Sequence, residues 1–264
     1  MTLPAAPLAT RGVGEVAFAA SLPEAVVALF RLLTHLGNPY LLLACVAAAY
    51  VFGDRIGISR RGAAFALGLG LCAIGLVLGL KQFFGLPRPP ISYRSGLGFP
   101  SGHALGSTAF WGGVAVLADR GRWRRRLTAA GVVIVIVAAS RVLIGVHYLV
   151  DVVAGVGIGI ALLAVTLGFG PGFSVAGSTG PLARPDHRHV AGLFALALVL
   201  GLAGLAVAPG ESGLLLGPGA AAGAAAGGRR RGRRGGAAAG GGSAAARRGG
   251  GRAAAGRAGG RAGR

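Results

Sequence analysis

The sequence predicts an all-α, polytopic membrane protein with about six transmembrane helices in a bundle and a disordered C-terminal tail. Of its 264 residues, 53% are hydrophobic and only 13% are charged, and the mean hydropathy is +0.68. A soluble domain carries about twice that charged fraction. Apolar runs without charge at 63–80, 152–169 and 190–209 each have about the 20 residues that cross a bilayer core as a helix. These runs place the chain in a membrane.

The predicted spans follow one another within residues 22–209, which we expect to form one membrane domain. Residues 1–21 lack the basic start and continuous apolar stretch of a cleaved signal peptide, and we expect this segment to be poorly ordered. Residues 22–37 have helical spacing of apolar side chains and few charges, which favours a helix at the membrane interface. The six spans are predicted at 39–53, 63–80, 104–118, 127–146, 152–169 and 190–209.

Basic residues divide the predicted connections into two sets. Ten arginines fall in 54–62, 119–126 and 170–189, which share one side of the membrane if the spans alternate. The positive-inside rule places that side in the cytoplasm. The connections 81–103 and 140–151 then face the periplasm or exterior. The sequence therefore predicts a multi-pass protein of the cell membrane whose unusual polar residues face outward.

The tail, residues 210–264, differs in composition from the rest of the chain. From residue 217 onward it consists of Gly, Ala and eleven Arg, with only Pro218 and Ser243 besides, and it carries much of the net charge of +20. Such a segment cannot build a core. Because it has no Phe, Tyr or Trp to stack on bases, we expect no nucleic-acid partner. A disordered tail, a frameshifted extension of a GC-rich gene and a functional basic tail all fit this composition.

Three short polar motifs lie on the predicted outer side, each at the end of an apolar span. Ionisable residues at membrane depth are costly, and they indicate a functional site. In chain order the motifs contain Lys81, Arg88 and Pro89; then Pro100, Ser101, Gly102 and His103; and then Ser140, Arg141, His147 and Asp151.

The residue types in these motifs favour an anionic ligand. Lys81, Arg88 and Arg141 supply three cations, and an arginine fork can bind two phosphate oxygens. Ser101 and Gly102 begin a predicted helix, whose free N–H groups attract an anion. Lys81 is the only lysine among 27 basic residues, which favours a need for a compact ammonium group at that position.

The histidines add a reactive pair to this anion site. His147 and Asp151 are four residues apart, so on a helix they share a face. A carboxylate there can hold the imidazole tautomer and stabilise the cation that forms when the other nitrogen attacks. His103 is then available as a general acid, and the set describes phosphoryl transfer through a phosphohistidine. We expect neither a metal nor a cofactor, because Asp151 is the only carboxylate in the cluster.

The order K-x6-RP, PSGH and SR-x5-H-x3-D resembles the type 2 phosphatidic acid phosphatase family, part of the superfamily that includes vanadium haloperoxidases, and every motif position matches. The resemblance implies an all-helical fold with six spans over roughly residues 22–209. It also implies metal-independent removal of phosphate from lipid phosphates or pyrophosphates. By motif position His147 is the nucleophile, Asp151 its partner and His103 the acid. The residues implied to hold phosphate are Lys81, Arg88, Ser101, Gly102 and Arg141.

Three functions remain open from the sequence alone. The first is a phosphatase acting on a lipid phosphate or polyprenyl pyrophosphate in the bilayer, whose lipid tail leaves no signature among interchangeable apolar residues. The second is a phosphotransferase of the same superfamily that passes the group to an alcohol. The third is a non-catalytic lipid-binding membrane protein. A metal site at His187 and His189 is not favoured, because only Asp186 lies beside them.

Overall fold

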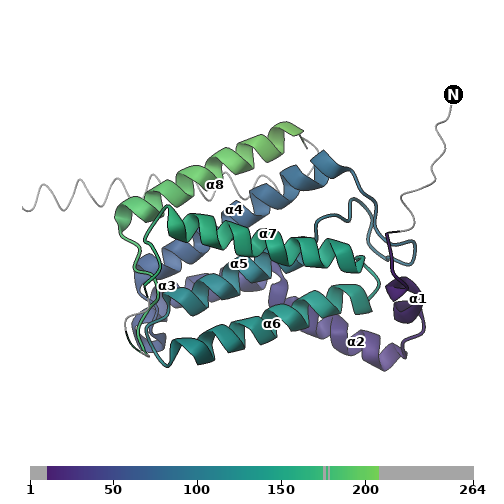
Figure 1. Cartoon of the computed structure of the whole chain (residues 1–264), viewed down its shortest axis with the longest axis horizontal. Helices are drawn as coiled ribbons and strands as arrows, with labels where there is room; N and C mark the ends of the chain where they lie inside the picture. The colour runs from purple at the N-terminus through teal and green to yellow at the C-terminus, as the bar shows by residue number, and fades with distance from the viewer. Residues whose placement is uncertain (1–10, 175–176, 178, 208–264) are drawn as a thin grey trace, which may run out of the picture. The chain divides into compact units, whose positions relative to one another are not determined.

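The computed structural model describes residues 11–174, 177 and 179–207, which fold into helices and connecting loops (Figure 1). The helices are α1 (Glu15–Ala20), α2 (Glu24–Leu33), the 3-10 helix η2 (Thr34–Gly37), α3 (Pro39–Ile56), α4 (Arg60–Phe84), α5 (Gly102–Leu117), α6 (Trp123–Leu143), α7 (Leu149–Gly168) and α8 (His187–Val207). Pairing of β type in this part of the chain is limited to two isolated bridges. The predicted all-α class is therefore confirmed. The predicted tail, 210–264, lies outside the described residues.

Local sequence signals set the ends of the long helices. Asn38 caps α3 and Ser59 caps α4, and each side-chain oxygen accepts a hydrogen bond from a backbone N–H of the first turn, at 2.9 and 3.0 Å. Helix α4 ends at Gly85, whose φ of 61° is left-handed and therefore suits glycine. This end places Lys81 in the last turn of α4, close to the start of the loop that follows the helix.

The number of membrane spans is smaller than the sequence predicted. Helices α4, α6, α7 and α8 are long and apolar enough to cross a membrane. Residues 24–37 and 39–53 make a fifth span if this pair, bent by 46°, counts as one. Helix α5 has 16 residues, about 24 Å of helix, which is short of the roughly 30 Å of a bilayer core. The described residues thus form a multi-pass membrane protein with four or five spans by length and composition, where about six were predicted.

Helix α5 packs against α4, α6 and α7, and α8 lies along α4 (Figure 1). Small residues allow two of these contacts to be close, as is common between membrane helices. A Cβ at Gly155 of α7 would lie 2.6 Å from the carbonyl oxygen of Ser101, and a Cβ at Gly75 of α4 would lie 2.8 Å from the carbonyl carbon of Leu200 in α8. The contact at Gly155 brings the first turn of α7 against the start of α5.

The connections gather at two ends of these helices. What we call the motif end consists of residues 11–37, 85–101 and 144–148, and what we call the opposite end consists of residues 57–59, 118–122, 169–174, 177 and 179–186. At the motif end the Ser101 N–H donates to the Asp151 carbonyl at 2.9 Å. At the opposite end the Asp119 N–H donates to the Gly57 carbonyl at 2.8 Å. The helices therefore alternate in direction, and all three motifs fall at the same end.

Candidate active site

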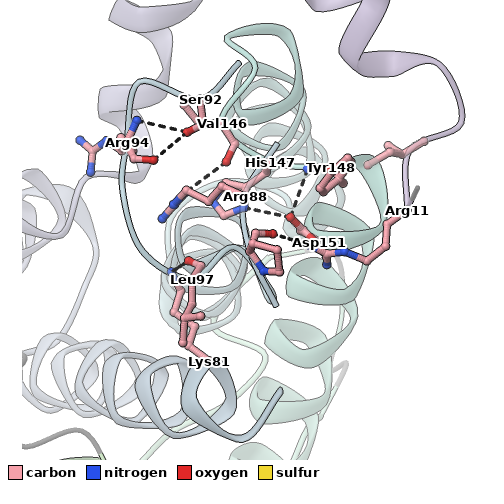
Figure 2. Close-up of polar contacts among 12 residues, drawn as sticks. Arg11, Lys81, Arg88, Ser92, Arg94, Leu97, Val146, His147, Tyr148 and Asp151 are labelled. Atoms are coloured by element: carbon pink, nitrogen blue, oxygen red, sulfur yellow. Dashed lines mark hydrogen bonds and ion pairs between the residues drawn. The ribbon is translucent and has the colours of Figure 1, made fainter. Parts of the chain in front are cut away.

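The motif end collects side chains from four helices and two connections (Figure 2). Figure 2 shows Arg88, His147 and Asp151 turned toward one another, with Lys81 below them. The contributing positions are the last turn of α4 (Lys81), the α4–α5 connection (Arg88), the start of α5 (Ser101, Gly102, His103), the end of α6 (Ser140, Arg141), the α6–α7 connection (His147) and the first turn of α7 (Asp151).

His147 and Asp151 form a buried pair, with exposed fractions of 2% and 0%. The Nδ1 atom of His147 lies 3.3 Å from Oδ2 of Asp151, and the backbone N–H of Tyr148 donates to the same oxygen at 3.1 Å. Because a carboxylate can only accept, Nδ1 carries the proton, and the lone pair of Nε2 is available as an acceptor. The predicted i, i+4 pairing is present, and Nε2 lies on the side of the ring away from Asp151.

Arg88 lies against that free nitrogen. Its Nη1 is 3.0 Å from Nε2 of His147, and it also donates to the carbonyl oxygen of Val146 at 3.0 Å. Its Nε donates to the carbonyl oxygen of Ser95 at 3.2 Å, which fixes the guanidinium from the other side. Because a guanidinium can only donate, Nη1 donates to Nε2 of His147, and an anion that binds Arg88 would release this nitrogen.

Lys81 is held to the same loop as Arg88. Its Nζ donates to the carbonyl oxygen of Leu97 at 2.8 Å (Figure 2). Leu97 and Arg88 both belong to the 85–101 connection, which folds back on itself because the Gly98 N–H donates to the Leu86 carbonyl at 2.7 Å. The lysine at the end of α4 thus anchors the loop that carries Arg88.

The start of α5 offers donors whose partners are missing from the protein itself. Ser101 is fully buried, and in the described structure its Oγ has no hydrogen-bond partner. The first N–H groups of a helix also lack intrahelical partners. A buried polar group without a partner costs about 1–3 kcal/mol, so each such group calls for an explanation. Gly102 has a packing reason as well, since a Cβ there would lie 3.2 Å from Cγ1 of Val77.

Arg141 is a buried cation that has an unpaired hydrogen-bond donor within the described residues. It is 2% exposed, its Nη1 donates to Oγ1 of Thr34 at 2.9 Å, and its Nε has no partner within the described residues. A buried guanidinium without an anion is unfavourable. The neighbouring Ser140 donates to the Val137 carbonyl at 2.6 Å, which is a bond within α6.

Burial and nearby charge set the protonation of the pair. Burial lowers the pKa of His147 to about 4, and the charges of Arg88 and Arg141 act in the same direction, whereas the hydrogen bond to Asp151 opposes them. The imidazole is therefore neutral at physiological pH. His103, half-buried at the start of α5, lies within the electrostatic reach of Arg141, Arg94 and His147.

Sequence reasoning missed one arginine that contacts the centre of the site. Nη1 of Arg11 lies 2.8 Å from Oδ1 of Asp151, and the guanidinium lies 4.8 Å from the ring centre of Tyr148. Residues 11–21 include helix α1 and form part of a segment for which the sequence predicted little order. A lone arginine outside any apolar pattern or motif gave no signal of this contact.

Thr34 and Arg94 were missed for the same reason. Thr34 lies in η2 and accepts from Arg141, and Arg94 lies in the 85–101 connection. Neither residue belongs to a motif. Thr34 reaches the site through a contact between distant parts of the chain, whereas Arg94 is bonded to Ser92 in its own connection and acts on His103 through its charge. The spacing of residues along one helix cannot reveal such contacts.

Asp186 and His189 make local hydrogen bonds at the start of α8, where Nδ1 of His189 accepts from the backbone N–H of Asp186 at 3.2 Å. Oδ1 of Asp186 accepts from the backbone N–H groups of Arg188 and His189 at 2.8 and 2.9 Å, so the carboxylate caps the helix. Within the described residues, no group of three or more His, Cys, Asp or Glu is arranged to hold a metal ion.

The three motifs lie within the part of the chain that matches a known family model. Residues 62–172, from α4 to just beyond α7, match the PAP2 superfamily. The resemblance read from the motif spacing is thereby confirmed, and Arg11 and Thr34 fall outside the matched PAP2 residues.

The chain is similar to one curated protein and to one crystal structure from Bacillus subtilis. Over 99 residues it is 30% identical to phosphatidylglycerophosphatase B of strain 168, a match that covers 34% of this chain and 49% of that protein. The chain thus spans about half the length of this curated relative. The fold is similar to the crystal structure of the first transmembrane PAP2-type phosphatidylglycerolphosphate phosphatase from Bacillus subtilis, with a TM-score of 0.53 and 25% identity over 59% of this chain and 82% of that one.

A third similarity is to the crystal structure of LpxE from Aquifex aeolicus. Its TM-score is 0.46 and its identity 21%, over 57% of this chain and 90% of that one.

Proposed function

We propose that this protein is a metal-independent phosphatase that removes phosphate from a lipid phosphate or isoprenoid pyrophosphate through a phosphohistidine at His147. The proposal rests on a chain of contacts that runs from Asp151 through His147 to Arg88. The carboxylate lies 3.3 Å from Nδ1, and a guanidinium nitrogen lies 3.0 Å from Nε2. A cation at that point can hold a phosphate oxygen beside the attacking nitrogen. The curated relative and the crystal structure from Bacillus subtilis, both named for phosphatidylglycerol phosphate, support this substrate class.

The free hydrogen-bonding groups of the site fit a phosphate. Nε of Arg141 and Oγ of Ser101 are both buried and without partners in the described structure. Phosphate oxygens would supply the acceptors that these donors lack, together with the first N–H groups of α5 at Gly102 and His103. Lys81 and Arg88 add positive charge from the connection that covers the site. These cations take the charge-neutralising part that a metal ion plays in other phosphoryl-transfer enzymes.

The first half of the reaction forms a bond between His147 and phosphorus. The lone pair of Nε2 attacks phosphorus, the bond from phosphorus to the lipid oxygen breaks, and its electron pair leaves with that oxygen. His103 gives the leaving oxygen a proton, so the lipid departs as an alcohol, or as a lipid phosphate if the substrate is a pyrophosphate. Asp151 stabilises the positive charge on the imidazole.

His103 must be protonated before it can act as a general acid. A bound substrate can favour this protonation. Burial lowers the pKa of His103, and the charges of Arg141 and Arg94 act in the same direction. A bound phosphate dianion offsets both arginines and favours protonation of His103 beside the leaving oxygen. The acid would thus become charged only when the substrate is in place.

The second half returns the protein to its starting state. A water molecule attacks phosphorus, and His103 now accepts its proton. The bond between phosphorus and Nε2 breaks, its electron pair returns to His147, and inorganic phosphate leaves. An alcohol in place of water would give a phosphotransferase, and the product assay below separates these two reactions.

Two features support a site that faces outward and draws its substrate from the bilayer. The ten arginines of the loops and helix ends at 54–62, 119–126 and 170–189 belong to the opposite end, and the positive-inside rule assigns such an end to the cytoplasm. Near the motifs, Phe83, Ile91 and Leu149 expose large apolar side chains. These side chains suit contact with acyl or prenyl chains at the membrane surface.

The test is phosphate release by the detergent-purified protein. The substrates are phosphatidic acid, phosphatidylglycerol phosphate and a polyprenyl pyrophosphate, each with and without excess EDTA. We expect release that survives EDTA, is lost in His147→Ala and persists in the control His187→Ala, whose histidine is exposed at the opposite end. Release that EDTA abolishes would refute the metal-free mechanism. Absence of release from every substrate by folded protein would favour a transferase or a lipid-binding protein.

A further inference from the structure

Arg11 precedes the PAP2 residues by about fifty positions, yet its side chain lies beside Asp151 (Figure 2). Nη1 lies 2.8 Å from Oδ1 of Asp151, and the side chain of Arg11 is only 15% exposed. The contact joins residues 140 positions apart in the chain. It is a partly buried pairing of a guanidinium with a carboxylate, the type of charge-assisted bond that is strong and directional.

The two carboxylate oxygens of Asp151 have separate partners. Oδ2 accepts from Nδ1 of His147 and from the backbone N–H of Tyr148, whereas Oδ1 accepts from Arg11. The carboxylate is fully buried, so an oxygen that loses its partner finds no water nearby. Without Arg11 the carboxylate would rotate to find another donor for Oδ1. This rotation weakens the bond to His147.

Arg11 is itself held in place by several contacts. Its guanidinium lies over the ring of Tyr148 at 4.8 Å, and its Nη2 donates to the carbonyl oxygen of Pro87. Four residues later, Oε1 of Glu15 accepts from the backbone N–H of Leu149 at 3.0 Å. The N-terminal segment is therefore fastened to the start of α7 at two points, and Arg11 also bridges α7 to the connection that carries Arg88.

The charge of Arg11 matters for an anionic substrate as well. A buried carboxylate next to a phosphate site repels the phosphate unless a cation balances it. Arg11 supplies this cation on the side of Asp151 that faces away from His147. The balance leaves Arg88 and Arg141 to act on the phosphate.

We infer that Arg11 is a positioning residue that locks the carboxylate of Asp151 against Nδ1 of His147. It acts through Asp151 and does not touch the substrate. The inference rests on the proposed function for its kinetic consequence. Its structural part, the orientation of Asp151 and His147, can be tested whatever the substrate is.

The kinetic test compares three variants of the full-length protein. Arg11→Gln is expected to lower kcat on the order of 10²-fold, as small displacements of a reacting group do, with KM changed less than threefold. Arg11→Lys should recover part of the loss, because it restores the charge without the planar fork. The control Arg125→Gln, at an exposed arginine of α6, should match the wild type. A kcat of Arg11→Gln within twofold of the wild type, or a loss confined to KM, would overturn the inference.

A second measurement does not depend on turnover. The chain has five histidines, so ¹⁵N-histidine labelling gives few signals, and the Nδ1–H signal of His147 is identified by its loss in His147→Gln. This signal should shift or broaden in Arg11→Gln and stay in place in Arg125→Gln. An unchanged signal in Arg11→Gln overturns the inference. If the wild type releases no phosphate, the proposed function fails, and this signal alone decides the role of Arg11.

Discussion

The two ends of the helices are both rich in arginine but use it differently. Near the opposite end, the guanidinium of Arg126 donates to carbonyl groups of α5 and of two connections. It donates to Ala115, Gly121 and Gly180 at 3.0, 3.2 and 2.6 Å. Arg120 likewise donates to the carbonyl oxygen of Arg55. These arginines join connections that are far apart in the chain.

At the motif end the arginines are more deeply buried, and not all of their N–H donors are used in hydrogen bonds within the described structure. Arg141 is 2% exposed and keeps a free Nε, and Ser101 nearby keeps a free Oγ within the described structure. Arg88 lies against the imidazole of His147. Because these donors are buried and unpaired, they lower the free energy of unfolding of the protein.

The comparison teaches that charge alone does not mark the site. An arginine that donates to carbonyls of separate segments holds those segments together, whereas a buried arginine that has unpaired donors and no carboxylate partner can bind an anion. The following experiments test this distinction, beginning with the change that should have the largest effect.

Exchanging one arginine at each end should separate the two roles most clearly. Arg141→Gln is expected to reduce kcat/KM for phosphate release on the order of 10³-fold, because it removes a buried cation that would stabilise the transferring group. Arg126→Gln should leave kcat/KM within about twofold of the wild type and lower the thermal unfolding temperature instead. If both variants lose activity equally, the distinction between the two ends is wrong.

Lys81→Arg tests whether position 81 needs a compact ammonium group. The Nζ of Lys81 donates to the carbonyl oxygen of Leu97 at 2.8 Å, and a longer, planar guanidinium would push this loop and Arg88 out of place. We expect kcat to fall on the order of 10²-fold, measured as phosphate release from the best lipid substrate. Near-normal turnover would show that any cation suffices there.

The hydroxyl of Thr34 is expected to have a smaller effect through Arg141. Thr34→Val removes the acceptor of the 2.9 Å bond from Nη1 but keeps the shape of the side chain. Loss of a buried hydrogen bond to a charged group costs about 1.5–3 kcal/mol, so kcat/KM should fall about tenfold or more. Thr34→Ser keeps the hydroxyl and should retain most of the activity, and equal losses in the two variants would point to packing as the cause.

The pH dependence of stability should give the smallest effect. Burial lowers the pKa of His147 from 6.5 to about 4 in the folded protein. Between those values the unfolded chain binds more protons at this residue, so stability is lost as the pH falls from 6.5 toward 4. Thermal unfolding in detergent should show this loss, and His147→Gln should reduce it. An identical pH profile in the variant would mean that His147 is not held neutral by burial.

Most of the helices, and the side chains of the three motifs, could be predicted from the sequence. Apolar runs located the long helices, and the spacing of four between His147 and Asp151 predicted their contact because it lies within local structure. The number of membrane spans was predicted less accurately, because α5 is short for a helix that crosses a bilayer core. Arg11 and Thr34 could not be predicted, because their contacts bridge 140 and 107 positions and depend on how η2 and the N-terminal segment pack.

Trapping a covalent intermediate tests the central claim most directly. The wild-type protein is mixed with a lipid phosphate labelled with ³²P, stopped in alkaline detergent within milliseconds and analysed for bound label. The account predicts a protein-bound label that is lost in acid, as a phosphohistidine is, and that is absent from His147→Gln. Label that persists in His147→Gln, or rapid phosphate release with no bound label at any time, would contradict it.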